Sequence, residues 1–407
     1  MPQPSYRWVI VAAGGFIGCV GMGAMFSLPV FLVPLTADTG WSRTGASGAM
    51  TIGFLAMAAS GIGWGLLVDR FGPRAVVTTG TLLLAAGLAL ASRAQNLLSF
   101  QIAFGALVGV SLSAILPPMM ATVTRWFETQ RSLAVSLVSA GFGMAPLTMS
   151  PFAAWLVTRT DWRSAMLVIA GVVLALMLPT TLLLRNAPAQ GRVAASAGGQ
   201  GVDNGGMTTA DALRSTPFLI LAVTNFFCCA THSGPIFHTV SYAIACGIAP
   251  LAAVSIYSLE GLTGMGGRLA FGILGDRLGA KPVLVAGLLV QAFVALAYMF
   301  VNQLDGFYVV AALFGFTYAG VMPLYAVLAR ENFPARMMGA IIGGTSTAGG
   351  LGMALGPLAG GWIYDTYATY SWLYLGSFGM GLGAFLIAMT YRPFPKPAMA
   401  TAGAQPA

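Results

Sequence analysis

The chain has 407 residues, of which 57% are hydrophobic and only 7% are charged, and its formal net charge is +8. A water-soluble globule of this length could not hide so much apolar surface in one core. The composition therefore excludes an ordinary soluble domain and indicates that lipid is the solvent for most of the chain.

Long apolar runs recur from Trp8 to Thr390, with short polar breaks between them. A run of about 20 apolar residues can cross roughly 30 Å of hydrocarbon as a helix. The runs are too long and too uniformly apolar for the alternating strands of a membrane barrel. We expect an all-α membrane protein with twelve transmembrane helices, in chain order at 8–36, 44–68, 75–92, 98–124, 132–157, 164–184, 217–247, 251–275, 282–301, 307–329, 337–363 and 371–390.

The basic residues indicate the orientation. With a cytoplasmic N-terminus, most Lys and Arg residues fall in cytoplasmic segments, whereas Arg43, Arg93, Arg159 and Arg163 face outward and Arg268 lies within a span. The first apolar run is too long for a signal-peptide core and is expected to remain as a span. We therefore expect a multi-pass protein of a plasma membrane, the inner membrane in a bacterium, with both termini cytoplasmic. The positive charge is spread over separate loops, so no nucleic-acid partner is expected.

One long hydrophilic stretch divides the chain. Residues 186–214, rich in Gly, Ala and Ser up to 206, are typical of a mobile cytoplasmic linker. This predicts an N-terminal six-helix bundle at 1–185 and a C-terminal six-helix bundle at 215–392, followed by a disordered cytoplasmic tail at 393–407.

The two predicted halves repeat one another. GLLVDRFGPR at 65–74 returns as GILGDRLGAK at 272–281, GFGMA at 141–145 returns as GLGMA at 350–354, and SLPVF at 27–31 returns as SGPIF at 233–237. Matches in the same order and at nearly constant spacing are hard to obtain by chance. They predict two pseudo-symmetric bundles.

Six plus six helices related by a parallel repeat is the arrangement of major facilitator transporters, whose substrate site lies near midplane between the halves. The sequence resembles this superfamily over essentially its whole length, and the G-x-L-x-D-R-x-G-x-R pattern at 65–74 is the superfamily's most specific mark. In the family this loop acts as a cytoplasmic latch. The resemblance therefore implies a cytoplasmic gate made of Asp69, Arg70, Arg74, Asp276 and Arg277. The alternative is that these charges only anchor the spans at the membrane surface.

Two formal charges are predicted inside the membrane, Arg268 and, two turns earlier in the same span, Glu260. A guanidinium at mid-helix costs about 2.5 to 3.5 kcal/mol on insertion scales, and it cannot escape by losing its proton. A bound carboxylate would offset this cost, because its two oxygens match the planar fork of arginine. Two alternatives stay open: an internal pair with Glu260, and snorkelling of the long side chain toward the cytoplasmic boundary.

An arginine in the eighth span followed shortly by a D-R-x-G loop resembles the monocarboxylate porters and the related oxalate–formate exchangers. The resemblance implies that Arg268 binds the substrate carboxylate. The chain departs from this group at two places: Gly264 stands where animal monocarboxylate porters carry an aspartate, and GAIIGGTSTAGGLGMALG in the eleventh span lacks the second cation of the oxalate exchanger. One buried cation indicates a substrate with one carboxylate.

Other polar residues could line the site. His232 and His238 flank Pro235 in the seventh span, and a proline there favours a local break of the kind found where a helix lines a cavity. His238 could bind the substrate or carry a proton near neutral pH. The alternative for both histidines is a hydrogen bond between helices.

In the tenth span, the hydroxyl of Tyr318 could share the carboxylate with Arg268, and Tyr325 lies on the same helical face. Weaker candidates could supply an apolar pocket or a further polar contact, and each fits simple packing as well. They are Phe26, Leu28, Met119, Met144, Tyr242 and Ser346.

These features predict a secondary active transporter of a small monocarboxylate such as lactate or pyruvate, working by proton-coupled symport and alternating access. A co-transported proton avoids moving net charge against the membrane potential, which costs about 2.3 kcal/mol per charge per 100 mV. Glu260 and His238 are the candidate proton carriers. The expected partners are the organic anion, the proton and membrane lipid; no cofactor and no metal are expected, and the unit is a monomer.

Other classes fit less well. An exchanger of the oxalate–formate type stays possible, as does a drug/proton antiporter, although the fifth span reads GFGMAPLTMSPFAAW and lacks the G-P-x-x-G-G element of such exporters. A membrane enzyme is not expected, because the chain contains neither H-E-x-x-H nor G-x-S-x-G.

Overall fold

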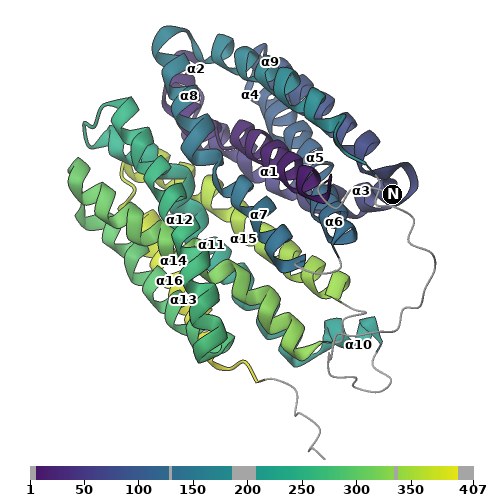
Figure 1. Ribbon diagram of the computed structural model, residues 1–407. Coiled ribbons are helices and arrows are strands. Elements are labelled where there is room, and N and C mark those ends of the chain that lie inside the picture. The colour runs from purple at the N-terminus through teal and green to yellow at the C-terminus, as the bar shows by residue number, and fades with distance from the viewer. Residues whose placement is uncertain (1–5, 128–130, 186–207, 334–337, 393–407) are drawn as a thin grey trace, which may run out of the picture.

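The computed structural model describes residues 6–127, 131–185, 208–333 and 338–392. The described residues are almost entirely helical and form two bundles that lie side by side, the first in purple to teal and the second in green to yellow (Figure 1). The predicted tail at 393–407 and most of the predicted linker, 186–207, lie outside the described residues.

The first bundle contains the six predicted spans of the N-terminal half, several of which are divided into shorter helices. In chain order it consists of α1 (Tyr6–Met25), α2 (Leu28–Thr39), α3 (Arg43–Ser92), α4 (Leu97–Phe100), the π-helix η1 (Gln101–Leu107), α5 (Val108–Ser113), α6 (Leu116–Trp126), α7 (Arg131–Gly143), α8 (Ala145–Arg159) and α9 (Trp162–Thr181).

The second bundle follows a short helix, α10 (Thr209–Arg214), which forms within the predicted linker and is capped by reciprocal hydrogen bonds between Thr208 and Asp211. Its helices are α11 (Thr216–Ala245), α12 (Pro250–Leu278), α13 (Ala280–Ala297), the 3₁₀ turn η2 (Tyr298–Phe300), α14 (Leu304–Asn332), α15 (Met338–Tyr367) and α16 (Ser371–Met389). These helices account for the six predicted spans of the C-terminal half.

The repeated D-R-x-G motifs form equivalent turns. α3 contains two predicted spans and folds back at Gly72, which has φ 79° and ψ 165° and precedes Pro73. Gly279, at the equivalent place between α12 and α13, has φ 89° and ψ 144°. Only glycine adopts such a positive φ without steric strain, so the repeat of this residue has a conformational cause.

Prolines coincide with three breaks in the first bundle but not with a break in α11. α1 gives way to α2 next to Pro29, α5 to α6 next to Pro117, and α7 to α8 next to Pro146. The break expected near Pro235 is absent, because α11 runs unbroken from Thr216 to Ala245 with this proline inside it. A membrane helix can continue through a proline, because neighbouring helices, side chains or ordered water can satisfy the carbonyl that the proline leaves free.

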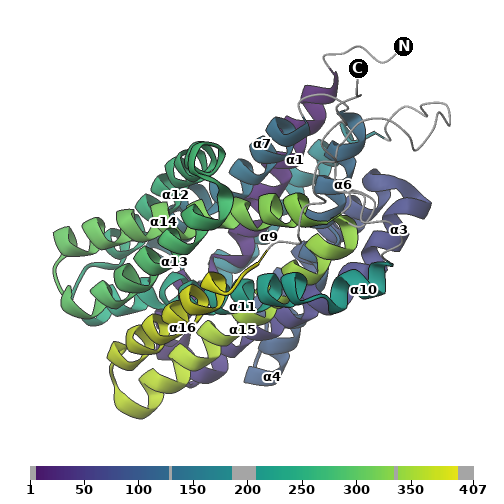
Figure 2. The ribbon, with the colours of Figure 1, turned by 90° about the horizontal axis from the view of Figure 1, so that it is seen from below.

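Within the described residues, nine helical stretches are long and apolar enough, by length and composition alone, to cross a membrane. The three predicted spans not among them belong to α3, α12 and α15. These helices meet the opposite bundle: α3 packs along α15, which also packs on α11 (Figure 2), and α12 packs against α8. All three of these spans thus lie at the junction of the two bundles.

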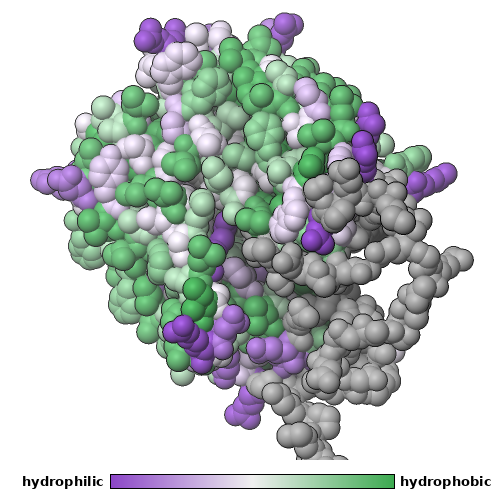
Figure 3. All heavy atoms as spheres, in the orientation of Figure 1, coloured by the Kyte–Doolittle hydropathy of each residue, from purple (hydrophilic) through white to green (hydrophobic). Residues whose placement is uncertain are grey.

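The outer surface is apolar. Large side chains such as Phe16, Leu98, Trp155, Phe293 and Leu386 are exposed. On the face drawn in Figure 3 hydrophobic side chains predominate, and many strongly hydrophilic ones lie toward its margins. Such a surface is stable in lipid and not in water.

Candidate functional site

Arg268 lies at the junction of the two bundles. Its side chain is half-buried, and its Nη1 donates a hydrogen bond of 3.3 Å to the backbone carbonyl of Ser139 in α7. The guanidinium therefore contacts the opposite half of the molecule. This contact offsets part of the cost of placing a permanent cation in the bundle, and it leaves other N–H groups for a ligand.

Glu260 does not pair with Arg268 in this conformation. Its side chain is fully buried in α12, and neither carboxylate oxygen has a hydrogen-bond partner among the described residues. The first alternative for Arg268, an ion pair with Glu260, is therefore not formed in this conformation. An ionised carboxylate without a partner is costly in an apolar interior.

Tyr318 lies near both of these charged residues. It belongs to α14, is half-buried, and is close enough to interact electrostatically with both Arg268 and Glu260. Its ring centroid lies 5.1 Å from that of His232 and 5.4 Å from that of Phe314. The structure thus brings Arg268, Glu260, Tyr318 and His232 together at one place.

The two histidines lie in different surroundings. His232 is buried, with Nδ1 at 3.2 Å from Nε2 of Gln291. His238 is buried six residues further along α11, with Nε2 at 3.0 Å from the carbonyl of Pro357 in α15 and its ring 5.2 Å from that of Tyr370. His238 joins helices α11 and α15, as the alternative interpretation of this residue expected, and is not grouped with Arg268.

The weaker candidates are scattered. Phe26 is half-buried at the α1–α2 break, Leu28 is fully buried in the core, and Ser346 is exposed on α15. Of the two methionines, Met119 is buried and Met144 is exposed at the α7–α8 break. The two tyrosines donate hydrogen bonds to backbone carbonyls, Tyr242 to Val301 at 3.1 Å and Tyr325 to Thr224 at 3.4 Å. No contact with Arg268 is recorded for any of these seven.

The predicted gate residues lie at the end of the bundles that carries Gly72 and Gly279. The side chain of Asp69 is outside the described part of the structure, and the other four, Arg70, Arg74, Asp276 and Arg277, are exposed. Arg70 lies 5.3 Å from the ring centroid of its neighbour Phe71. Among the described side chains, these four form no recorded hydrogen bond with the opposite half.

Sequence reasoning missed a contact between the halves at the opposite end. Asp365 of α15 accepts hydrogen bonds from the N–H of Arg43 at 3.1 Å and from the N–H and hydroxyl of Thr44 at 2.8 and 2.6 Å. Arg43 donates to the hydroxyl of Tyr370 at 2.7 Å and stacks on Tyr364 at 3.6 Å. A carboxylate from one half thus caps the first turn of α3 in the other.

This end contact gives a testable prediction. Replacing Asp365 with alanine removes several charge-assisted hydrogen bonds, each worth about 1.5 to 3 kcal/mol, so this end should open at least about tenfold more often. Ser47, buried in α3 beside Gly361, reports the opening. Maleimide should label Ser47→Cys at least about tenfold faster when Asp365→Ala is added. Asp305→Ala, which removes an exposed carboxylate at the start of α14, should leave the labelling rate unchanged.

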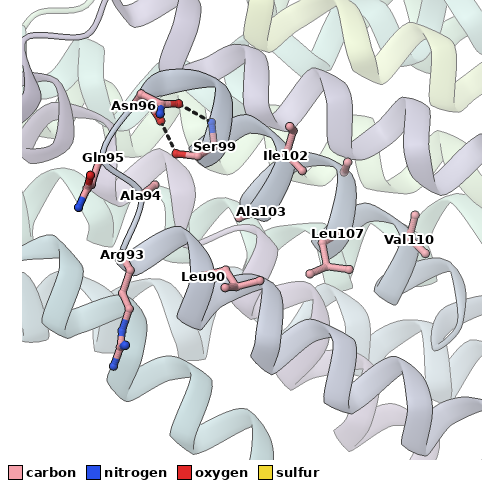
Figure 4. Close-up of a pocket in the computed structure, with 11 residues that line it drawn as sticks. Leu90, Arg93, Ala94, Gln95, Asn96, Ser99, Ile102, Ala103, Leu107 and Val110 are labelled. Carbon is pink, nitrogen blue, oxygen red and sulfur yellow. Dashed lines mark hydrogen bonds between the residues drawn. The ribbon is translucent and has the colours of Figure 1, made fainter.

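A groove on the first bundle is separate from this site. It runs between the end of α3 and η1, where Asn96 accepts a hydrogen bond of 2.9 Å from the N–H of Ser99 (Figure 4). Apolar side chains, among them Ile102 and Leu107, line its length. None of the predicted site residues borders it, and we assign it no role in transport.

Two six-helix bundles with a half-buried arginine at their junction define an integral, multi-pass membrane protein of the transporter class. The chain belongs to the Major Facilitator Superfamily, whose family model matches residues 14–350 and 269–407. The predicted fold and superfamily are thereby confirmed.

Relatives of this chain include monocarboxylate transporters. The chain is 27% identical to monocarboxylate transporter 13 of Bos taurus over 392 residues, which cover 95% of this chain and 88% of that protein. It is 31% identical to monocarboxylate transporter 11 of Mus musculus over 191 residues, which cover 45% of this chain and 41% of that protein.

Among solved structures, a bacterial homolog of the human lysosomal transporter Spinster, inward-facing and unoccupied, superimposes with a TM-score of 0.75. It is 15% identical, and the match covers 96% of this chain and 98% of that one. A nucleoside transporter aligns with a TM-score of 0.74 at 12% identity, and the match covers 95% of this chain and 99% of that one. At such identities these structures support the fold alone.

Proposed function

We propose that this protein is a proton-coupled symporter of a small monocarboxylate, such as lactate or pyruvate, working by alternating access. The observation that carries the proposal is Arg268, a half-buried guanidinium at the junction of the bundles with one recorded hydrogen bond to a neutral carbonyl. An anionic carboxylate is a stronger partner than a carbonyl, because its bonds to a guanidinium are charge-assisted and can be bidentate. The names of the relatives support the same class of substrate.

Tyr318 completes the proposed anion site. It lies on α14, within electrostatic range of Arg268, and its hydroxyl can donate to the second oxygen of the carboxylate. One cation and one phenol suit a substrate with a single negative charge.

Glu260 is the proposed proton carrier. It lies two turns before Arg268 on α12, buried and without a partner among the described residues, so a protonated carboxyl group fits this conformation. Gly264, between them, lies against α14: an added Cβ would come within 3.0 Å of Ala319 and 3.3 Å of the carbonyl of Gly315. No room is left there for the aspartate of animal monocarboxylate porters, so the carboxyl group one turn earlier takes its role.

In the proposed cycle, a proton and the anion enter together and the neutral loaded carrier rocks to the other side. The end with Asp365 is held by hydrogen bonds between the halves, whereas the described charges at the D-R-x-G end are exposed. We assign the D-R-x-G end, with both chain termini, to the cytoplasm and this conformation to the inward-open state. The latch of Asp69, Arg70, Arg74, Asp276 and Arg277 then closes in the opposite state.

The test is uptake of radiolabelled lactate into proteoliposomes that hold the purified protein. An inward proton gradient should drive lactate above its equilibrium level, and a protonophore should abolish the accumulation. Uptake that reaches only the external concentration and ignores the protonophore would contradict proton coupling.

A further inference from the structure

Gly143 has a charged side chain as its nearest neighbour. The three atoms closest to a Cβ added at Gly143 all belong to Arg268: Nη1, Cζ at 3.3 Å and Nη2 at 3.6 Å. Gly143 is the last residue of α7 in the first bundle, whereas Arg268 belongs to α12 in the second. The missing side chain makes room for a cation from the opposite half.

Helix packing explains the neighbouring glycine but not Gly143. A Cβ at Gly141 would overlap the backbone of Gly15 in α1, so Gly141 permits close contact within the first bundle. In the second copy of the G-x-G-M-A motif, Gly352 is the equivalent of Gly143, and its added Cβ would meet the backbone of Phe226 in α11. Within the described glycines of this motif, Gly143 alone faces a charge.

The position of Gly143 relative to Ser139 matters as well. The two residues are one helical turn apart, and Cα–Cβ bonds in a helix point toward its N-terminus, so a side chain at 143 would lie over the carbonyl of Ser139. Glycine leaves that carbonyl open to a second donor. Nη1 of Arg268 uses this opening at 3.3 Å.

We propose that Gly143 is a positioning residue that holds Arg268 at the junction, where a bound carboxylate takes the place of the Ser139 carbonyl as its partner. The inference rests on the proposed transport of a monocarboxylate. In the empty carrier, Arg268 links α12 to α7. The anion competes for the same N–H groups, so loading removes a hydrogen bond between the halves and frees them to rock.

The test is Gly143→Ala. The displaced atoms are the far end of a flexible side chain, so the methyl group should move the guanidinium at little cost in stability. We expect the KM for lactate to rise about tenfold, since the displaced guanidinium loses one charge-assisted hydrogen bond to the bound carboxylate, while Vmax changes less than about twofold and the Tm stays within error of wild type.

Gly266→Ala is the matched control, because Gly266 lies on α12 two residues before Arg268 and a Cβ there meets nothing within 4 Å. Its KM should equal that of wild type. An unchanged KM in Gly143→Ala overturns the inference, and so does a large fall in Tm, which would mean that glycine is needed for the backbone. If wild type itself carries no carboxylate, the proposed function fails instead, which is a separate and recognisable result.

Discussion

Replacing Arg268 with glutamine is expected to abolish lactate uptake into proteoliposomes. The side chain loses its charge but keeps a hydrogen-bonding amide, and a bidentate charged pair is worth several kcal/mol, so affinity should fall at least about 100-fold. The folded protein should be no less stable, because a half-buried cation has been removed. Uptake rates at several lactate concentrations, with Tm measured in detergent, test both statements.

Arg93→Gln is the control for Arg268→Gln. Arg93 is an exposed arginine that borders the groove on the first bundle and lies away from the junction. Its loss should leave uptake unchanged. Equal KM and Vmax in Arg268→Gln and wild type would mean that the guanidinium is structural.

Replacing Glu260 with glutamine is expected to abolish the coupling of lactate transport to the proton gradient while transport itself continues. Glutamine has the shape of a protonated glutamate but cannot release a proton, so a pH gradient should no longer concentrate lactate. Counterflow of lactate against unlabelled lactate at equal pH should continue, because Arg268 and Tyr318 stay in place. Both assays are run on one preparation. Accumulation driven by the pH gradient should be at least about tenfold lower in Glu260→Gln than in wild type, whereas counterflow should be equal.

Asp305→Asn is the control for Glu260→Gln, since Asp305 is an exposed carboxylate in the first turn of α14. It should behave as wild type in both assays. Full accumulation driven by the pH gradient in Glu260→Gln would show that another group carries the proton, and His238 would then be the next candidate.

The fold was predictable because its signals are local. Apolar runs long enough to cross the bilayer gave the twelve spans, and the repeated D-R-x-G motifs gave two turns that the structure builds with positive φ at Gly72 and Gly279. Pro235 misled the prediction, because whether a proline breaks a helix depends on neighbours that the sequence does not name.

Parts of the site were less predictable, because they too depend on neighbours that the sequence does not name. Arg268 stood out because an unneutralised cation in an apolar run is costly. Its partner is a backbone carbonyl, which every residue possesses, so no sequence pattern points to Ser139. Asp365 follows the predicted span 337–363, where a charged residue is common, and its role in capping α3 depends on how the two bundles meet. The sequence favoured His238 over His232, and only the packing of α11 shows that His232 is the histidine beside Tyr318.

Counterflow of lactate, oxalate and the lipophilic cation tetraphenylphosphonium, compared in one proteoliposome preparation, separates a monocarboxylate carrier from an oxalate exchanger and from a drug antiporter. We expect labelled lactate to accumulate transiently in wild type, oxalate and the cation not to do so, and Arg268→Gln to remove the lactate signal. Counterflow of oxalate or of the cation without lactate, unaffected by Arg268→Gln, would contradict the assignment of this protein as a monocarboxylate carrier.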